Sequence, residues 1–131
     1  MGIEKDYLMR QLLMLFEVIQ KILRYRKKGE KGKAFEEIKY FYECLNIDKK
    51  VDSMDIAELV ELLESKKKLT NEHIEMVAWV LKEQGELAEQ ESKKTDYYRK
   101  AFFLFEKVER ESVTFSMDRQ MKLAELRMYL N

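Results

Sequence analysis

The amino-acid sequence predicts an all-α protein, and three features of its 131 residues lead to this prediction. The chain has no proline and only four glycines, so few residues interrupt a helix. Hydrophobic residues make up 46% and charged residues 38%, and the helix formers Leu, Glu, Lys, Met and Ala are abundant. The β-branched runs and frequent turn residues of strand-rich folds are missing. We therefore expect an all-α protein with about six helices, in one domain that covers residues 1–131.

The first predicted helix covers about residues 4–28 and carries two apolar stripes. One stripe follows steps of four and three: Leu8, Leu12, Leu15, Ile19 and Ile22. The second stripe lies beside it: Met9, Leu13, Phe16 and Leu23. Two stripes on one helix predict two neighbours. The sequence leaves open whether both neighbours belong to the same domain or whether one stripe serves a partner chain.

A basic segment at residues 24–33 follows this helix and includes two glycines, which favour a helix cap and a turn. Its six cations are Arg24, Arg26, Lys27, Lys28, Lys31 and Lys33. Cations near a helix C-terminus stabilise the helix dipole, which is a purely structural role. The alternative is a patch for phosphate or an acidic partner. The formal net charge is zero and no nucleic-acid-binding motif is present, so both features disfavour a nucleic-acid partner.

Two more helices are predicted before residue 65. The second helix covers residues 33–45, and its inner face consists of Ala34, Ile38, Phe41 and Leu45. Residues 46–52 are predicted to form a loop. A short third helix covers residues 54–64, with Ser53 as its N-cap and Asp55 in its first turn.

The second half of the chain predicts three helices. Thr70 is expected to cap a helix that reaches about residue 91, and the next helix covers residues 96–110. After a linker at residues 112–116, Ser116 is expected to cap the last helix. That helix has two apolar sides, and we expect both to cover the last hairpin: Met121, Ala124 and Met128 on one, and Leu123, Leu126 and Leu130 on the other.

Two small residues mark an expected close contact between helices. Gly85 lies inside a helical run, where glycine costs about 1 kcal/mol relative to alanine, so its presence requires a reason. Ala101 shares a helix face with the larger residues Tyr98, Phe105 and Val108. We expect two neighbouring helices to approach closely at these positions.

Two motifs in this region resemble the tetratricopeptide repeat. The first helix of a repeat is similar to Leu81-x-x-x-Gly85-x-x-Ala88, and the second is similar to Tyr98-x-x-Ala101-x-x-x-Phe105-x-x-Val108. A weaker match covers Gly29-x-x-Gly32-x-Ala34-x-x-x-Ile38-x-x-Phe41. The chain departs from the family pattern in three ways: about four extra residues between the two matched helices, no helix-ending proline, and a third helix too short for a full repeat.

The length, the helix order and the opening Asp6-Tyr7-Leu8-Met9-Arg10-Gln11 also resemble a family of small bacterial proteins with tetratricopeptide-like helices, a domain of unknown function. This resemblance implies a right-handed stack of antiparallel hairpins. The first helices of such a stack line a groove for a peptide or a partner helix. The resemblance implies a fold and no particular activity.

Residue types that carry catalysis or bind metals are sparse in the sequence. His73 is the only histidine and Cys44 the only cysteine, so a transition-metal site lacks its usual ligands. We interpret His73 as a surface or half-buried residue in the first turn of its helix, and Cys44 as a residue at the edge of the core. A thiol or metal enzyme would need both residues in one pocket. The sequence therefore predicts no enzyme and no cofactor.

The sequence also bears on location and function. Acidic residues stand where a signal peptide has basic ones, and the apolar segment 11–16 is too short to span a membrane, so we expect a cytoplasmic protein. The predicted function is a non-catalytic scaffold that binds a protein or peptide, or forms a homodimer through its first or last helix. The alternative is a regulatory protein that docks on nucleic acid or an anionic surface through residues 24–33.

Overall fold

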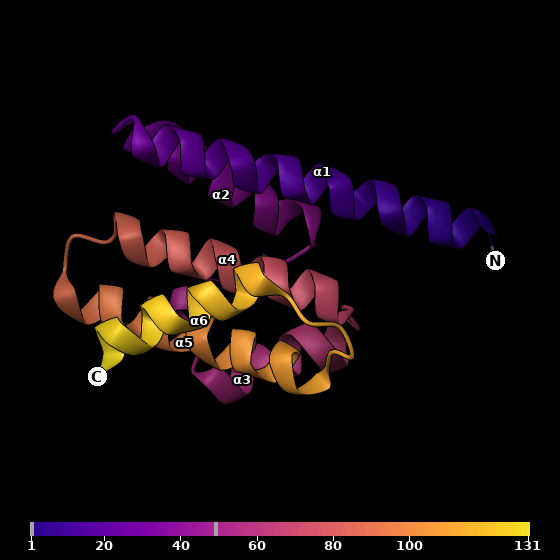
Figure 1. The fold of residues 1–131 in the computed structure, drawn as a ribbon. Coiled ribbons are helices and arrows are strands. Elements are labelled where there is room, and N and C mark those ends of the chain that lie inside the picture. Colours follow the sequence, from indigo (N-terminus) through magenta and orange to yellow (C-terminus); the bar gives the residue numbers. More distant parts are fainter. Residues whose placement is uncertain (1, 49) are drawn as a thin grey trace. The chain divides into compact units, whose positions relative to one another are not determined.

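The computed structural model of the protein describes residues 2–48 and 50–131 and confirms the predicted all-α class. Six α-helices and no strands are found in these residues (Figure 1). Contacts between residues divide the chain into two compact units, Met1–Lys49 and Lys50–Asn131. The single domain expected from the length stays a prediction.

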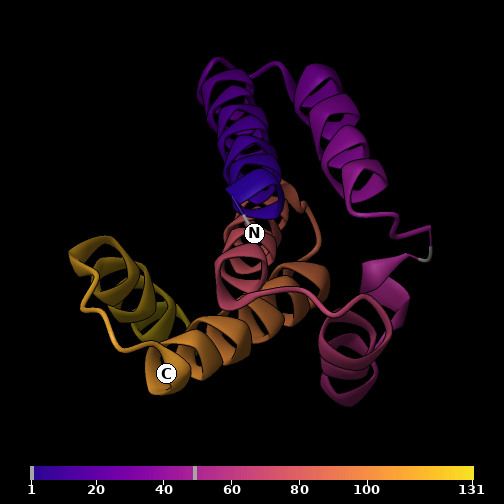
Figure 2. The ribbon, with the colours of Figure 1, turned by 90° about the vertical axis from the view of Figure 1, so that its right-hand side faces the viewer.

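The first unit contains a hairpin of two helices, α1 (Gly2–Lys27) and α2 (Lys31–Cys44), which lie side by side (Figure 2). Gly29 ends α1 with a φ of +77°, a conformation that glycine adopts without strain. The turn is closed because Glu30 N–H donates to the Tyr25 carbonyl at 2.9 Å and Gly29 N–H donates to the Arg26 carbonyl at 3.0 Å. The predicted helices are thus confirmed to within two residues at each end.

The second unit begins with three short helical segments: η1 (Val51–Ser53), α3 (Ile56–Val60) and η2 (Glu61–Lys66), a π-helical continuation of α3. The predicted cap Ser53 is wrong, because its hydroxyl donates to the Lys50 carbonyl at 2.8 Å within η1. Asp55 caps α3 instead. Its carboxylate accepts from Glu58 N–H at 2.8 Å, and the Glu58 carboxylate accepts from Asp55 N–H at 3.3 Å. This reciprocal capping box explains why the helix begins after Asp55.

The next two helices, α4 (Asn71–Leu87) and α5 (Glu91–Glu111), pack against each other as a hairpin. Thr70 caps α4 as predicted. The predicted boundary between the helices is wrong, because α4 ends at Leu87 and α5 already begins at Glu91. The first turn of α5 is polar and largely exposed, so apolar periodicity could not reveal it. The loop therefore lacks the four extra residues expected from the tetratricopeptide comparison.

Gly85 occupies the close contact between α4 and α5 that the sequence predicted. A Cβ atom on Gly85 would overlap the ring of Tyr98, so only glycine fits at this position without a shift of the ring. Tyr98 is buried, and Ala101 has no exposed surface. Lys94 Nζ also donates to the Gly85 carbonyl at 2.7 Å, which ties the start of α5 to the end of α4.

The last helix, α6 (Met117–Leu130), packs against α5. Ser116 caps it as predicted, since its hydroxyl accepts from Arg119 N–H at 3.2 Å. The prediction that both apolar sides of this helix cover the last hairpin is wrong. Leu123 and Leu126 are buried, whereas Met121 and Met128 are exposed. One side of α6 thus forms core and the other forms surface.

Candidate functional site

The two apolar stripes of α1 have different environments. Leu15, Ile19 and Ile22 of the first stripe are fully buried. Three members of the second stripe are exposed, with relative accessibilities of 51% for Met9, 59% for Leu13 and 42% for Phe16. We call Met9, Leu13 and Phe16, together with the exposed residues Arg10 and Glu17 beside them, the open face of α1. An exposed apolar stripe at helical spacing is typical of a surface that contacts another helix.

Each charged residue of the open face directly follows one of its apolar residues in the sequence. Arg10 follows Met9, and Glu17 follows Phe16. Arg10 Nε lies 3.4 Å from the Asp6 carbonyl, a long hydrogen bond within the same helix. Within the described part of the chain, Glu17 has no ion-pair partner. The open face therefore offers one cation and one anion to a neighbour, seven residues apart.

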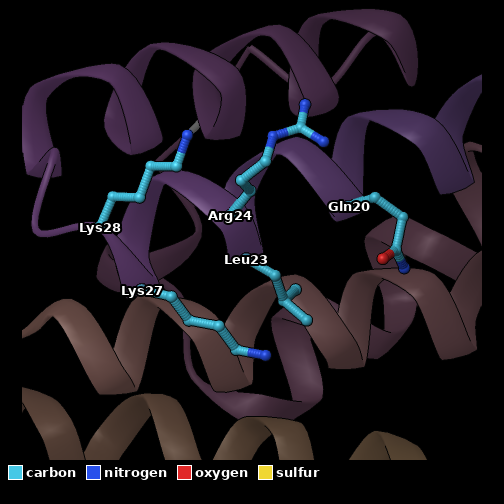
Figure 3. A pocket seen from close by; sticks show the side chains of 5 residues that line it. All are labelled: Gln20, Leu23, Arg24, Lys27 and Lys28. Atoms are coloured by element: carbon cyan, nitrogen blue, oxygen red, sulfur yellow. The ribbon is translucent and has the colours of Figure 1, made fainter.

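The predicted basic segment is only partly gathered into one site. Arg24, Lys27 and Lys28 are exposed, and they line a shallow pocket of about 390 Å³ together with Gln20 and Leu23. No carboxylate lines it. Figure 3 shows Arg24 and Lys28 pointing to one side of the helix and Lys27 to the other. The three cations thus form a basic rim and do not converge on one point.

The other three predicted cations have separate environments. Lys33 pairs with Glu30 at 3.1 Å and lies 5.7 Å from the centre of the Tyr25 ring. Arg26 and Lys31 do not line the pocket and have interactions of their own. The pocket thus gathers Arg24, Lys27 and Lys28, and the anion patch of six residues stays a prediction.

Cys44 lies at the end of α2, in a second pocket of about 470 Å³. Tyr7, Arg10, Gln11 and Met14 of α1 form the rest of the lining. The thiol is half-buried, and its hydrogen bond raises the pKa of the Tyr40 hydroxyl. His73 belongs to the second unit, so the paired thiol site considered from the sequence stays untested.

The last helix carries a second exposed apolar surface, which we call the methionine face of α6. Its members follow helical steps of four, three and four: Met117, Met121, Ala124 and Met128. Met121 has a relative accessibility of 58%, close to the value for Leu13 on α1. Asp118 and Glu125 border this face and are largely exposed, and both already pair with lysines of the second unit.

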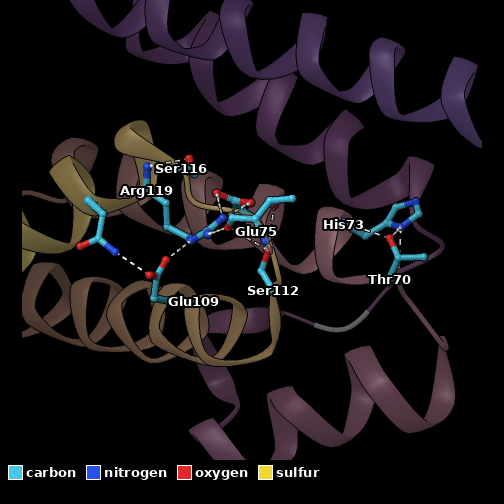
Figure 4. A network of polar contacts seen from close by, with 9 residues as sticks. Thr70, His73, Glu75, Glu109, Ser112, Ser116 and Arg119 are labelled. Carbon is cyan, nitrogen blue, oxygen red and sulfur yellow. Dashed lines mark hydrogen bonds and ion pairs between the residues drawn. The ribbon is translucent and has the colours of Figure 1, made fainter.

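Arg119, on the inner side of α6, is a buried cation that sequence reasoning missed. Its guanidinium pairs with Glu109 of α5 at 2.7 Å and with Glu75 of α4 at 3.2 Å, and it also donates to the Thr114 carbonyl at 3.0 Å (Figure 4). Burial raises the pKa of Glu75, and the charge of Arg119 opposes this rise. The position of Arg119 in the sequence could have indicated its burial, because it shares a helix face with the buried Leu123 and Leu126.

Two lysines of α5 are buried in a similar way. Lys100 pairs with Asp96 at 2.7 Å and donates to the Val51 carbonyl at 3.2 Å. Lys107 pairs with Glu64 of η2 at 2.6 Å and with Glu111. Both side chains hold the short segments of residues 51–66 against α5. Because each charge has a specific partner, these lysines are explained as structural residues.

His73 is buried, so the expectation of a surface or half-buried histidine is wrong. Its Nδ1 lies 2.7 Å from the Thr70 hydroxyl and 3.4 Å from Thr70 N–H, and it completes the cap of α4 (Figure 4). Burial lowers the pKa of the imidazole, which favours the neutral ring that can accept these hydrogen bonds. The histidine is therefore a capping residue of α4.

Comparison with protein-family models, with curated proteins and with solved structures finds no match to this chain. Among residues 2–48 and 50–131, no group of three His, Cys, Asp or Glu side chains is placed to hold a metal ion. In the same residues, no helix combines the length and apolarity needed to cross a bilayer.

Proposed function

We propose that the protein is a non-catalytic interaction module that binds another protein chain through the open face of α1. The single observation that carries this proposal is the exposure of Met9, Leu13 and Phe16 beside a stripe in which Leu15, Ile19 and Ile22 are fully buried and Leu8 and Leu12 are half-buried. An exposed apolar stripe is unfavourable in water unless a neighbour covers it part of the time. The spacing of the stripe fits a partner helix, since residues at steps of four and three meet one neighbouring helix.

Other features support the interpretation as a tetratricopeptide-like scaffold. The chain contains the hairpins α1–α2 and α4–α5, and Gly85 occupies the close contact in the second of these. The buried charges Arg119, Lys100 and Lys107 are used to hold helices together. We also propose a cytoplasmic location, supported by the single free cysteine.

Photo-cross-linking tests the proposed function. A photoreactive phenylalanine analogue replaces Leu13 in the full chain, and a control variant carries it at Glu36, an exposed position on α2. After irradiation in an extract of the source cells, we expect a discrete cross-linked protein product from position 13 and none from position 36. A mass of twice the chain identifies a second copy, and any other mass identifies a different partner. No product from position 13 would contradict the proposal.

The basic rim of Arg24, Lys27 and Lys28 favours a second candidate function, docking on an anionic surface or nucleic acid. Three exposed cations line one pocket without a carboxylate among its lining residues. Binding to single-stranded DNA or to anionic lipid vesicles should then weaken as salt rises, and an Arg24→Glu/Lys28→Glu variant should lose it. Binding that does not change with salt would count against this function.

A further inference from the structure

We propose that a second copy of the same chain covers the open face of α1, with the two α1 helices antiparallel around a twofold axis. This inference rests on the proposed function and names its partner. It uses two properties of the described residues: the spacing of the apolar stripe, and the signs of the two charges beside it.

The stripe fits helix pairing because Met9, Leu13, Phe16, Gln20 and Leu23 alternate steps of four and three. This is the spacing of the contact positions in a two-helix coiled coil. In one antiparallel register, Leu13 packs against Phe16 of the second copy, and Met9 packs against Gln20 of the second copy. Each of these contacts occurs twice by symmetry. The most exposed residue of the stripe, Leu13 at 59%, then lies at the centre of the pair.

The charges select this register. It places Arg10 opposite Glu17 of the second copy, and the twofold axis repeats the pair. Glu17 has no ion-pair partner in the described part of the chain, so the contact supplies one. A shift by one heptad would place Arg10 opposite Arg24, and Glu17 opposite its own symmetry mate. Both contacts would join like charges, which is unfavourable.

The direction of the pair follows from the basic end of α1. Parallel helices would bring Arg24, Lys27 and Lys28 of both copies side by side, which would be repulsive. Antiparallel helices place these cations at opposite ends of the pair. Charge complementarity therefore favours one register and one direction.

The methionine face of α6 does not offer the same complementarity. An antiparallel pair of α6 helices would match Met121 with Ala124 of the second copy. It would also place Asp118 opposite Glu125 of the second copy, twice by symmetry. Two carboxylates would then face each other on each side of the axis. The two exposed apolar surfaces are thus distinguished by their bordering charges.

Sedimentation equilibrium with a matched pair of variants tests where the copies meet. Leu13→Glu and Met121→Glu replace apolar residues of nearly equal exposure, 59% and 58%, on the two faces. One helix pair buries less than the roughly 1,200 Å² of a standard interface, so we expect a weak dimer with a micromolar or higher Kd. The concentration series must therefore extend well above that range. Circular dichroism confirms that each variant is folded.

We expect the wild type and Met121→Glu to dimerise alike, and Leu13→Glu to remain monomeric. A wild type that stays monomeric at every concentration would overturn the proposal. So would a dimer that survives Leu13→Glu and is lost in Met121→Glu. If cross-linking at residue 13 captures a different protein while the wild type stays monomeric, the interaction module stands and the homodimer fails.

Charge reversal tests the register. Arg10→Glu alone would face Glu17, and Glu17→Arg alone would face Arg10, so each single variant turns two attractive pairs into repulsive ones. We expect each to weaken the dimer about tenfold or more, and the double variant Arg10→Glu/Glu17→Arg to restore it to near the wild-type Kd. A double variant as weak as either single variant would overturn the antiparallel register.

Discussion

The two units of the chain use their charged residues in different ways. In the second unit, Arg119, Lys100 and Lys107 are buried, and each pairs with a carboxylate on a neighbouring element or one turn away. In the first unit, Arg24, Lys27 and Lys28 remain at the surface. The second unit thus uses its charges to fix its own helices, whereas the hairpin of the first unit keeps both charges and an apolar stripe exposed. This difference is the reason why we propose the first unit as the one that contacts another chain.

The largest expected effect comes from breaking the buried charge network of the second unit. Arg119→Ala leaves Glu75 and Glu109 without their guanidinium, and we expect the free energy of unfolding to fall by about 2–3 kcal/mol. The expected loss is below that for fully buried pairs, because the two carboxylates retain side-chain accessibilities of 27% and 33%. Denaturant unfolding followed by circular dichroism measures it.

Lys33→Ala is the matched control in the first unit, since its pair with Glu30 is exposed. We expect no measurable change in unfolding for this variant. Equal losses from Arg119→Ala and Lys33→Ala would contradict the contrast between the two units.

A smaller change in stability is expected from replacing two glycines that lie in helices of different units. Gly85→Ala places a methyl group against the Tyr98 ring and should destabilise the protein by about 1–2 kcal/mol. Gly32→Ala in α2 meets no atom within 4 Å and should stabilise it by up to about 1 kcal/mol, because alanine is the better helix former. Thermal unfolding of both variants shows whether each substitution stabilises or destabilises the protein. A stabilising Gly85→Ala would show that Tyr98 does not limit the contact.

The smallest effect concerns pH. Burial lowers the pKa of His73 in the folded chain, whereas in the unfolded chain it lies near the usual value of about 6.5. The unfolded chain therefore takes up a proton first, so stability should fall as pH drops below about 6.5, by at most about 1.4 kcal/mol per pH unit. His73→Gln keeps a side chain that can cap the helix and should remove this component of the pH dependence. Identical pH profiles for the wild type and His73→Gln would contradict this account.

The sequence predicted the helices well where apolar periodicity is strong. The helices α1 and α2, the caps Thr70 and Ser116, and the close contact at Gly85 follow from spacing and cap chemistry. The boundary between α4 and α5 could not be predicted, because residues 91–95 are polar and mostly exposed and carry no periodicity. Asp55 was missed as a cap although Asp-x-x-Glu is a capping-box pattern.

The candidate site was only partly predictable. The second stripe of α1 was visible as a pattern, but only coordinates show that Met9, Leu13 and Phe16 are exposed. The buried pairs of Arg119 join residues up to 44 positions apart, and no local pattern encodes such a distance. The basic segment illustrates the same limit: its six cations all lie within residues 24–33, and three of them line the pocket.

An isotope-filtered NOE experiment on an equal mixture of labelled and unlabelled chains tests whether a second copy covers the open face of α1. We expect intermolecular NOEs between the Leu13 methyl groups of one copy and the Phe16 ring of the other. A concentrated sample in which every NOE from Leu13 is intramolecular would contradict it.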